Sequence, residues 1–150
     1  MISEPKQLNL WFQSKKHDWN TPKYLFKQLD NEFHFELDPC SDNNNLNTRY
    51  YFTEKDNGLV QDWKKLRTFV NPPYGRELIK WVKKSYEESK KGSLVVMLIP
   101  ARTNTNWFHD YILNNKNAET RFVRGRLCFE GATEKMPFPF VIVVLKETKK

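Results

Sequence analysis

Long apolar runs are missing from this chain of 150 residues, and none approaches the roughly 18 residues that a membrane-spanning helix needs. Charged residues, among them Glu4 and Lys6, interrupt the first segment, so we expect no secretory signal there. Cysteine is scarce: Cys40 and Cys128 stand far apart, which predicts free thiols in a cytoplasmic protein. No zinc-ligand spacing occurs, and the histidines are scattered, so the sequence predicts no metal site.

The length fits a single domain over residues 1–150, with flexible ends expected at about 1–15 and 147–150. Basic residues outnumber acidic ones by 25 to 18, which gives a net charge of +7 and an isoelectric point near 9.4. Because neutralising phosphates releases counterions, this balance favours a polyanionic partner. Charge alone does not separate a nucleic-acid-binding protein from a basic soluble one, so the motifs must decide.

Apolar patterning alternates between strand and helix along the chain. Helices are predicted to begin at Thr21-Pro22, with threonine as the N-cap and proline in the first turn, and to cover 77–91 and 106–113. Strands are predicted at 33–37, 50–52, 66–70, 94–99, 120–123, 126–129 and 138–145. This alternation indicates an α/β fold of three layers, with a largely parallel central sheet that ends in an antiparallel hairpin joined by short turns.

The tetrapeptide Asn71-Pro72-Pro73-Tyr74 follows the strand predicted at 66–70, at the sheet edge where open α/β folds bind ligands. The two prolines have fixed φ angles and donate no backbone hydrogen bonds. The turn therefore presents the Asn71 side-chain oxygen and the Pro72 carbonyl as acceptors, with Tyr74 as a stacking surface. That combination suits an exocyclic amino group on a planar ring. The tetrapeptide alone leaves open a plain Pro-Pro turn with a surface tyrosine.

Further short motifs accompany this tetrapeptide in a fixed order. They are Trp19-x-Thr21-Pro22, Leu37-Asp38-Pro39, Gly58-Leu59 with Asp62-Trp63, Pro100-Ala101-Arg102-Thr103, Trp107-Phe108-His109 and Gly125-Arg126-Leu127-x-Phe129. The set resembles the small phage and prophage DNA N6-adenine methyltransferases, a family of S-adenosylmethionine-dependent enzymes. The resemblance implies a Rossmann-like methyltransferase fold, double-stranded DNA as partner, no metal, a monomer or homodimer, and the cytoplasm of a bacterial host.

The same resemblance assigns roles to individual residues. Asn71, Pro72, Pro73 and Tyr74 would form the catalytic loop that takes a flipped-out adenine. The residues implied to bind S-adenosylmethionine are Trp19, Thr21, Pro22, Asp38, Pro39, Asp62 and Trp63. Those implied to contact DNA are Arg102, Arg124 and Arg126. The glycine-rich loop of larger methyltransferases is absent, because Cys40-Ser41-Asp42 stands in its place.

Simpler interpretations stay open for several of these residues. Asp38 could cap a turn, Thr21 could only begin a helix, and Trp63 could belong to the core. The arginines around Gly125 could form an exposed basic turn. At the level of function, the alternatives are methylation of RNA adenine or protein glutamine, and a nucleic-acid-binding module with a decayed methyltransferase fold.

Overall fold

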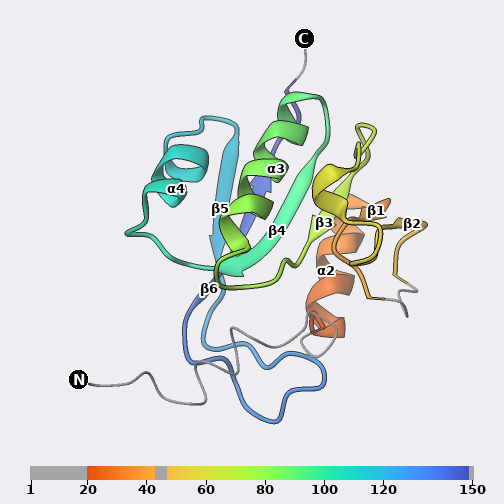
Figure 1. Cartoon of the computed structure of the whole chain (residues 1–150). Coiled ribbons are helices and arrows are strands. Elements are labelled where there is room, and N and C mark those ends of the chain that lie inside the picture. Colours follow the sequence, from red (N-terminus) through yellow and green to blue (C-terminus); the bar gives the residue numbers. More distant parts are fainter. Residues whose placement is uncertain (1–19, 43–46, 149–150) are drawn as a thin grey trace.

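A six-stranded sheet forms the centre of the computed structural model, which describes residues 20–42 and 47–148 (Figure 1). The strand order is β2-β1-β3-β4-β6-β5. The pairs β2–β1, β1–β3 and β3–β4 are parallel, whereas β6 runs antiparallel to both β4 and β5. The strands are β1 (Leu37–Asp38), β2 (Tyr50–Tyr51), β3 (Thr68–Val70), β4 (Val95–Pro100), β5 (Ala118–Phe122) and β6 (Phe140–Leu145). The predicted α/β class and the mostly parallel sheet are confirmed.

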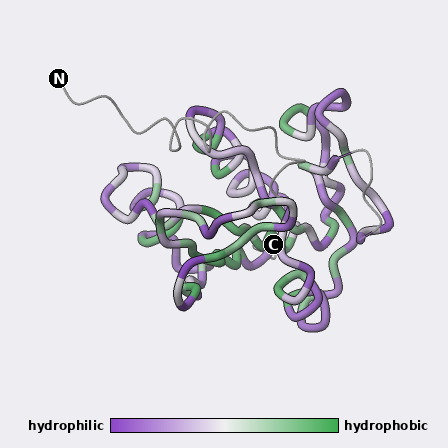
Figure 2. The backbone as a smooth tube through the Cα atoms, turned by 90° about the horizontal axis from the view of Figure 1, so that it is seen from below, coloured by the Kyte–Doolittle hydropathy of each residue, from purple (hydrophilic) through white to green (hydrophobic). Residues whose placement is uncertain are grey.

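Strands β4 and β6 hold the centre of the core, because every residue in both is buried. Their continuous apolar runs fit strands that are covered on both faces. Figure 2 shows the same pattern, with hydrophobic segments gathered toward the middle of the molecule and hydrophilic ones around it. The exposed ends of the sheet are the short strand β2 and the edge strand β5.

Helix α3 (Leu78–Lys90) packs against β4 and β6. It buries Leu78, Trp81 and Val82 at helical spacing, and Gly92 follows its end with a φ of 117°. The predicted helix at 106–113 is instead a short α4 (Asn106–Phe108) that continues as a π-helical turn, η3 (His109–Leu113). A 3-10 turn, η2 (Gly58–Val60), precedes β3.

The strand predicted at 33–37 is wrong over most of its length. Phe33 is the last residue of helix α2 (Lys23–Phe33), and β1 begins only at Leu37. His34 ends the helix with a left-handed φ of 54°, and its N–H donates to the carbonyl of Asp30. Phe35 and Leu37 are buried although they lie beyond the end of the helix, and this produces the alternating apolar pattern. Phe35 packs with Phe26 and Phe69, which fixes α2 against β3.

The predicted hairpin at the end of the chain is only partly right. Strands β5 and β6 are antiparallel neighbours, but a long connection, residues 123–139, joins them instead of a short turn. The strand expected at 126–129 does not form, and only an isolated bridge between Asn20 and Glu130 lies nearby. The remaining strands agree with their predicted bounds to within two residues at each end.

Candidate active site

The sheet brings four strand ends with predicted site residues to one edge. Because β1, β3 and β4 are parallel, Asp38 at the end of β1 lies on the same side of the sheet as Asn71 and Ala101, which directly follow β3 and β4. Strand β5 runs in the same direction as β4, since both are antiparallel to β6. Residues 123–139 therefore leave β5 at this edge too, which we call the carboxyl edge.

Asn71 lies directly after β3 and is only 2% exposed. Its side-chain amide makes two hydrogen bonds across the carboxyl edge. Nδ2 donates to Oγ1 of Thr21 at 3.0 Å, and Oδ1 accepts from the hydroxyl of Tyr74 at 2.6 Å. The amide thus joins the segment before α2 to the proline-rich loop, which brings together two of the motifs that the sequence singled out.

Tyr74 is buried rather than exposed, at 8% of its full accessibility, so the surface-tyrosine alternative is wrong. Its ring packs against Phe140 and Phe129, at centroid distances of 5.4 Å and 6.2 Å. Burial raises the pKa of its phenol well above the ordinary value, and the nearby Cys40 thiol adds to the rise. The hydroxyl therefore stays protonated and donates to the oxygen of Asn71.

The start of α2 differs from the prediction in a way that affects the site. The helix begins at Lys23, and Pro22 is the N-cap residue without a side-chain cap. Thr21 does not cap the helix, because its hydroxyl accepts from Asn71. The cap comes from the far end of the chain: Oε1 of Glu130 accepts from the N–H of Lys23 at 3.2 Å. A carboxylate also suits the positive end of the helix dipole.

Asp38 stands at the end of β1, half-buried at the carboxyl edge. Its Oδ1 accepts from the N–H of Cys40 at 3.0 Å, so it caps the turn that Pro39 begins. The turn role is compatible with a place at the carboxyl edge, because Asp38 is the last residue of β1. Element η2 packs on this turn, because Gly58 lies directly against Pro39.

Gly58→Ala is expected to destabilise the protein by about 1–3 kcal/mol, the usual cost of overpacking. A Cβ at this position would overlap the carbonyl oxygen of Pro39, which is backbone and cannot swing aside. Urea denaturation followed by tryptophan fluorescence measures the change in the free energy of unfolding. An unchanged midpoint would mean that the turn after β1 shifts freely.

Trp63 is completely buried in the loop before β3. Its Nε1 donates to the carbonyl of Gly58 at 2.9 Å, and its backbone N–H donates to Oε1 of Glu88 at 2.7 Å. Glu88 is itself buried on α3, between the ammonium groups of Lys84 and Lys91 at 3.7 Å and 3.2 Å. The Glu88 carboxylate raises the pKa of Lys91, so that lysine stays charged. The contacts of Trp63 are those of a core residue.

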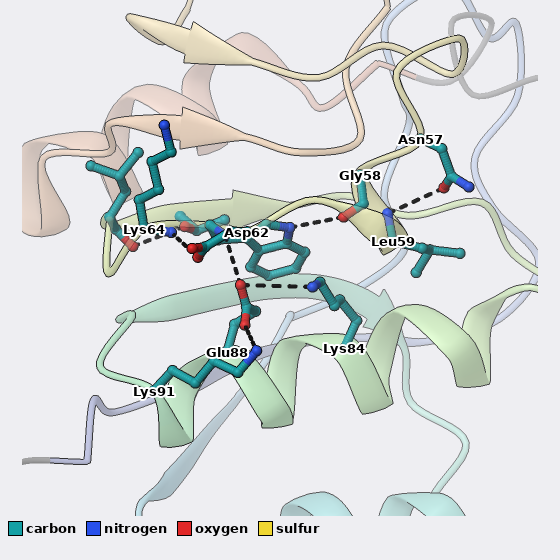
Figure 3. Close-up of polar contacts among 11 residues, drawn as sticks. Asn57, Gly58, Leu59, Asp62, Lys64, Lys84, Glu88 and Lys91 are labelled. Atoms are coloured by element: carbon teal, nitrogen blue, oxygen red, sulfur yellow. Dashed lines mark hydrogen bonds and ion pairs between the residues drawn. The ribbon is translucent and has the colours of Figure 1, made fainter.

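The structure does not bring Asp62 to the carboxyl edge. In Figure 3, Asp62 and Lys64 lie over the last turn of α3, whereas Gly58 lies further toward the start of that helix. The last turn of α3 leads into the beginning of β4, so this end of the helix faces the opposite, amino edge of the sheet. The carboxylate of Asp62 accepts from the N–H of Lys64 at 2.8 Å, which closes a local turn.

The three predicted DNA-contacting arginines follow strands that end at the carboxyl edge. Arg102 comes after β4, in a loop that the His109 ring nitrogen Nε2 fixes through a 2.8 Å hydrogen bond to the carbonyl of Thr103. Arg124 and Arg126 are exposed on the 123–139 connection and flank Gly125, whose φ is 72°. Trp19, the remaining predicted cofactor residue, lies outside the described residues.

Two residues of the site went unrecognised in the sequence. Phe129 belongs to a motif that was noticed, but nothing local shows that it packs on Tyr74. Glu130 gives no signal, because its hydrogen bond to Lys23 spans 107 residues of sequence. Within residues 20–42 and 47–148, no three histidine, cysteine or acidic side chains gather as metal ligands. No described helix is both long and apolar enough to cross a bilayer.

Comparison with known proteins gives a consistent result. Residues 10–148 match the family described as "DNA N-6-adenine-methyltransferase (Dam)". The chain is 29% identical over 106 residues to a DNA N-6-adenine-methyltransferase of Haemophilus phage HP1 (strain HP1c1), covering 69% of this chain and 61% of that protein. It is 30% identical over 92 residues to a DNA N-6-adenine-methyltransferase of Escherichia phage T1, covering 60% of this chain and 38% of that protein. The chain thus spans less than two thirds of the length of both relatives.

Proposed function

The chain belongs to the DNA N-6-adenine-methyltransferase (Dam) family, and on this premise we propose that it methylates the N6 amine of adenine in double-stranded DNA, with S-adenosylmethionine as methyl donor. One observation carries the proposal: the amide of Asn71 is held in a buried loop at the carboxyl edge, with its oxygen turned toward Tyr74. This edge is where open α/β sheets bind their ligands.

Asn71 and Pro72 supply the chemistry that the target amine needs. The lone pair of that amine is delocalised into the adenine ring, so the amine is a poor nucleophile at rest. Hydrogen bonds from N6 to Oδ1 of Asn71 and to the carbonyl of Pro72 draw the nitrogen toward tetrahedral geometry. These bonds strengthen as the amine takes the methyl group, so they stabilise the transition state more than the bound substrate. N6 then loses one proton to solvent.

Tyr74 shares the acceptor that this step uses. Its hydroxyl donates to Oδ1 of Asn71, an amide oxygen with two lone pairs, and its ring packs against both Phe129 and Phe140. A flipped adenine would donate to the same oxygen and stack on the tyrosine ring. Phenol and adenine are both planar, so the two rings can stack face to face.

The methyl donor supplies an activated methyl group, and Asp38 is the residue best suited to hold it. The carboxylate is half-buried at the end of β1, beside the strand that precedes Asn71. An acidic group in that place fits the positively charged amino end of the donor. Thr21 and Pro22 border the same edge through the bond to Asn71. Asp62 and Trp63 have no part in this proposal, because their contacts lie in the loop over α3.

The DNA-binding part of the proposal rests on charge and placement. The net charge is +7, and Arg102, Arg124 and Arg126 follow strand ends at the carboxyl edge. Each phosphate that they neutralise adds salt-dependent affinity without sequence preference. We further propose a three-layer, Rossmann-like arrangement. The protein would act in the cytoplasm of a bacterial host, as a monomer or a homodimer. The packing of α2 on Phe69 of β3 and of α3 on β4 supports the layers.

Asp38→Asn is expected to weaken binding of S-adenosylmethionine about tenfold or more, because it removes a charge that pairs with the donor's amino group. Asparagine keeps an oxygen for the N–H of Cys40, so the turn after β1 survives. Isothermal titration calorimetry measures the dissociation constant, with the exposed Asp110→Asn as a matched control. Equal affinities for the wild type and Asp38→Asn would remove Asp38 from the donor site.

The function is tested with methyl-labelled S-adenosylmethionine and three substrates: unmethylated duplex DNA, RNA and a glutamine-containing protein extract. We expect label in DNA, in the N6-methyl derivative of deoxyadenosine. Label in RNA or protein instead would identify one of the alternative acceptors. Binding to DNA with no transfer, and no binding of S-adenosylmethionine, would favour a binding module.

A further inference from the structure

We propose that Thr21 is a positioning residue that fixes the side-chain amide of Asn71 with its oxygen toward the target amine. This inference rests on the proposed function of the Asn71 loop. It gives Thr21 a different task from the cofactor contact that the sequence predicted, and a different one from the helix cap that Thr21-Pro22 usually indicates. This role follows from the hydrogen bonds that the amide nitrogen and the amide oxygen of Asn71 each make.

An asparagine amide works as an acceptor in only one of its two orientations. Rotation by half a turn would present Nδ2 to the amine of adenine and set two donors against each other. In the structure, the hydroxyl of Thr21 accepts from Nδ2 at 3.0 Å, and the hydroxyl of Tyr74 donates to Oδ1 at 2.6 Å. The shorter distance is typical of an O–H···O bond, and the longer one of N–H···O. Both bonds select the same orientation.

The two bonds differ in what happens to them during the reaction. The Tyr74 hydroxyl shares the oxygen that N6 needs, so the incoming amine either competes with that bond or takes the second lone pair of the oxygen. The Thr21 bond is at the nitrogen, which the target does not contest. It can therefore hold the amide in its productive orientation before and during methyl transfer, when a rotated amide would be most costly.

Thr21 is available for this because another residue performs the capping. Glu130 accepts the N–H of Lys23 through its carboxylate, and its own N–H donates to the carbonyl of Asn20 at 2.8 Å. These contacts clamp the chain on both sides of Thr21. Pro22 adds a fixed φ of −54°. A threonine that would otherwise turn back to the helix is held with its hydroxyl toward Asn71.

The test compares Thr21→Val, which keeps the shape and removes the hydroxyl, with Thr21→Ser, which keeps the hydroxyl. We expect Thr21→Val to lower kcat for DNA methylation roughly tenfold, equivalent to about 1.4 kcal/mol in the barrier. The dissociation constant of S-adenosylmethionine should stay within about twofold of wild type, and Thr21→Ser should restore most of kcat. Thr120→Val, in the middle of β5, controls for the exchange itself.

The other possible results distinguish an error in the role of Thr21 from an error in the proposed function. If Thr21→Val weakens S-adenosylmethionine binding and leaves kcat unchanged, Thr21 is a cofactor residue and the inference is wrong. If neither quantity changes, the bond to Asn71 has no role in the reaction. If Thr21→Val does not fold, Thr21→Ala takes its place, with Thr21→Ser still expected to be active. A wild-type protein that methylates no adenine contradicts the proposed function itself, before any variant is compared.

Discussion

Asn71→Ala is expected to lower kcat for DNA methylation by roughly 100-fold or more, the loss typical of removing one group that binds the transition state. The alanine has no oxygen to accept from N6, so the Pro72 carbonyl is left as the single acceptor of the pair. Cofactor binding should change little, because the contacts proposed for the donor are made by Asp38. Single-turnover methylation gives the rate, and calorimetry gives the dissociation constant of S-adenosylmethionine.

The same substitution has a structural cost that must be kept apart from the catalytic one. It leaves the hydroxyls of Thr21 and Tyr74 without the amide that both now contact. Losing buried partners of this kind costs about 1–3 kcal/mol, so the assay belongs well below the melting temperature of the variant. The exposed Asn114→Ala is the matched control. A folded Asn71→Ala protein with near-normal kcat would refute the catalytic assignment.

Trp63→Ala should produce the largest loss of stability, about 3–5 kcal/mol, because it empties a fully buried indole site. It also breaks the hydrogen bond to Gly58 and removes the ring beneath Lys84, whose ammonium lies 5.7 Å from the ring centroid. For a chain of this size the melting temperature should fall by roughly 10 °C. Calorimetric scanning measures the shift.

Trp63→Phe separates packing from hydrogen bonding at this position. Phenylalanine keeps most of the apolar contact and lacks the N–H, so its cost should be clearly smaller than that of alanine, about 1–2 kcal/mol. Neither variant should change the affinity for S-adenosylmethionine at temperatures where it is folded. A stable Trp63→Ala protein that no longer binds the donor would return Trp63 to the cofactor site that its motif suggests.

The parts of the fold that depend on local pattern could be predicted from the sequence. Strands β4 and β6 are continuous apolar runs, and α3 has a helical stripe that Gly92 ends, so each was recognised within two residues at its ends. The Asn71 loop was placed correctly at the end of β3, because a strand followed by two prolines leaves little freedom.

The parts that depend on distant contacts could not be predicted. Phe33 continues the helix although it alternates with Phe35, because Phe35 packs on Phe69 of β3 from beyond the helix end at His34. The sequence near Thr21 does not reveal that Glu130 caps helix α2, so that the Thr21 hydroxyl bonds Asn71 instead. Tyr74 was expected to face a ligand, but its ring is covered by Phe129 and Phe140. A local motif shows which groups are present, and only the fold shows what they touch.

The proposed function requires that the Asn71 loop catalyse methylation of adenine N6 in duplex DNA. To test this requirement, the wild type and Asn71→Ala are incubated with the same unmethylated duplex and S-adenosylmethionine, and the nucleosides are then identified by mass spectrometry. We predict N6-methyldeoxyadenosine from the wild type and almost none from the variant, with equal binding of the donor. A methylated cytosine or an unmodified duplex from the wild type, or equal methylation by both proteins, would refute the proposed role of Asn71.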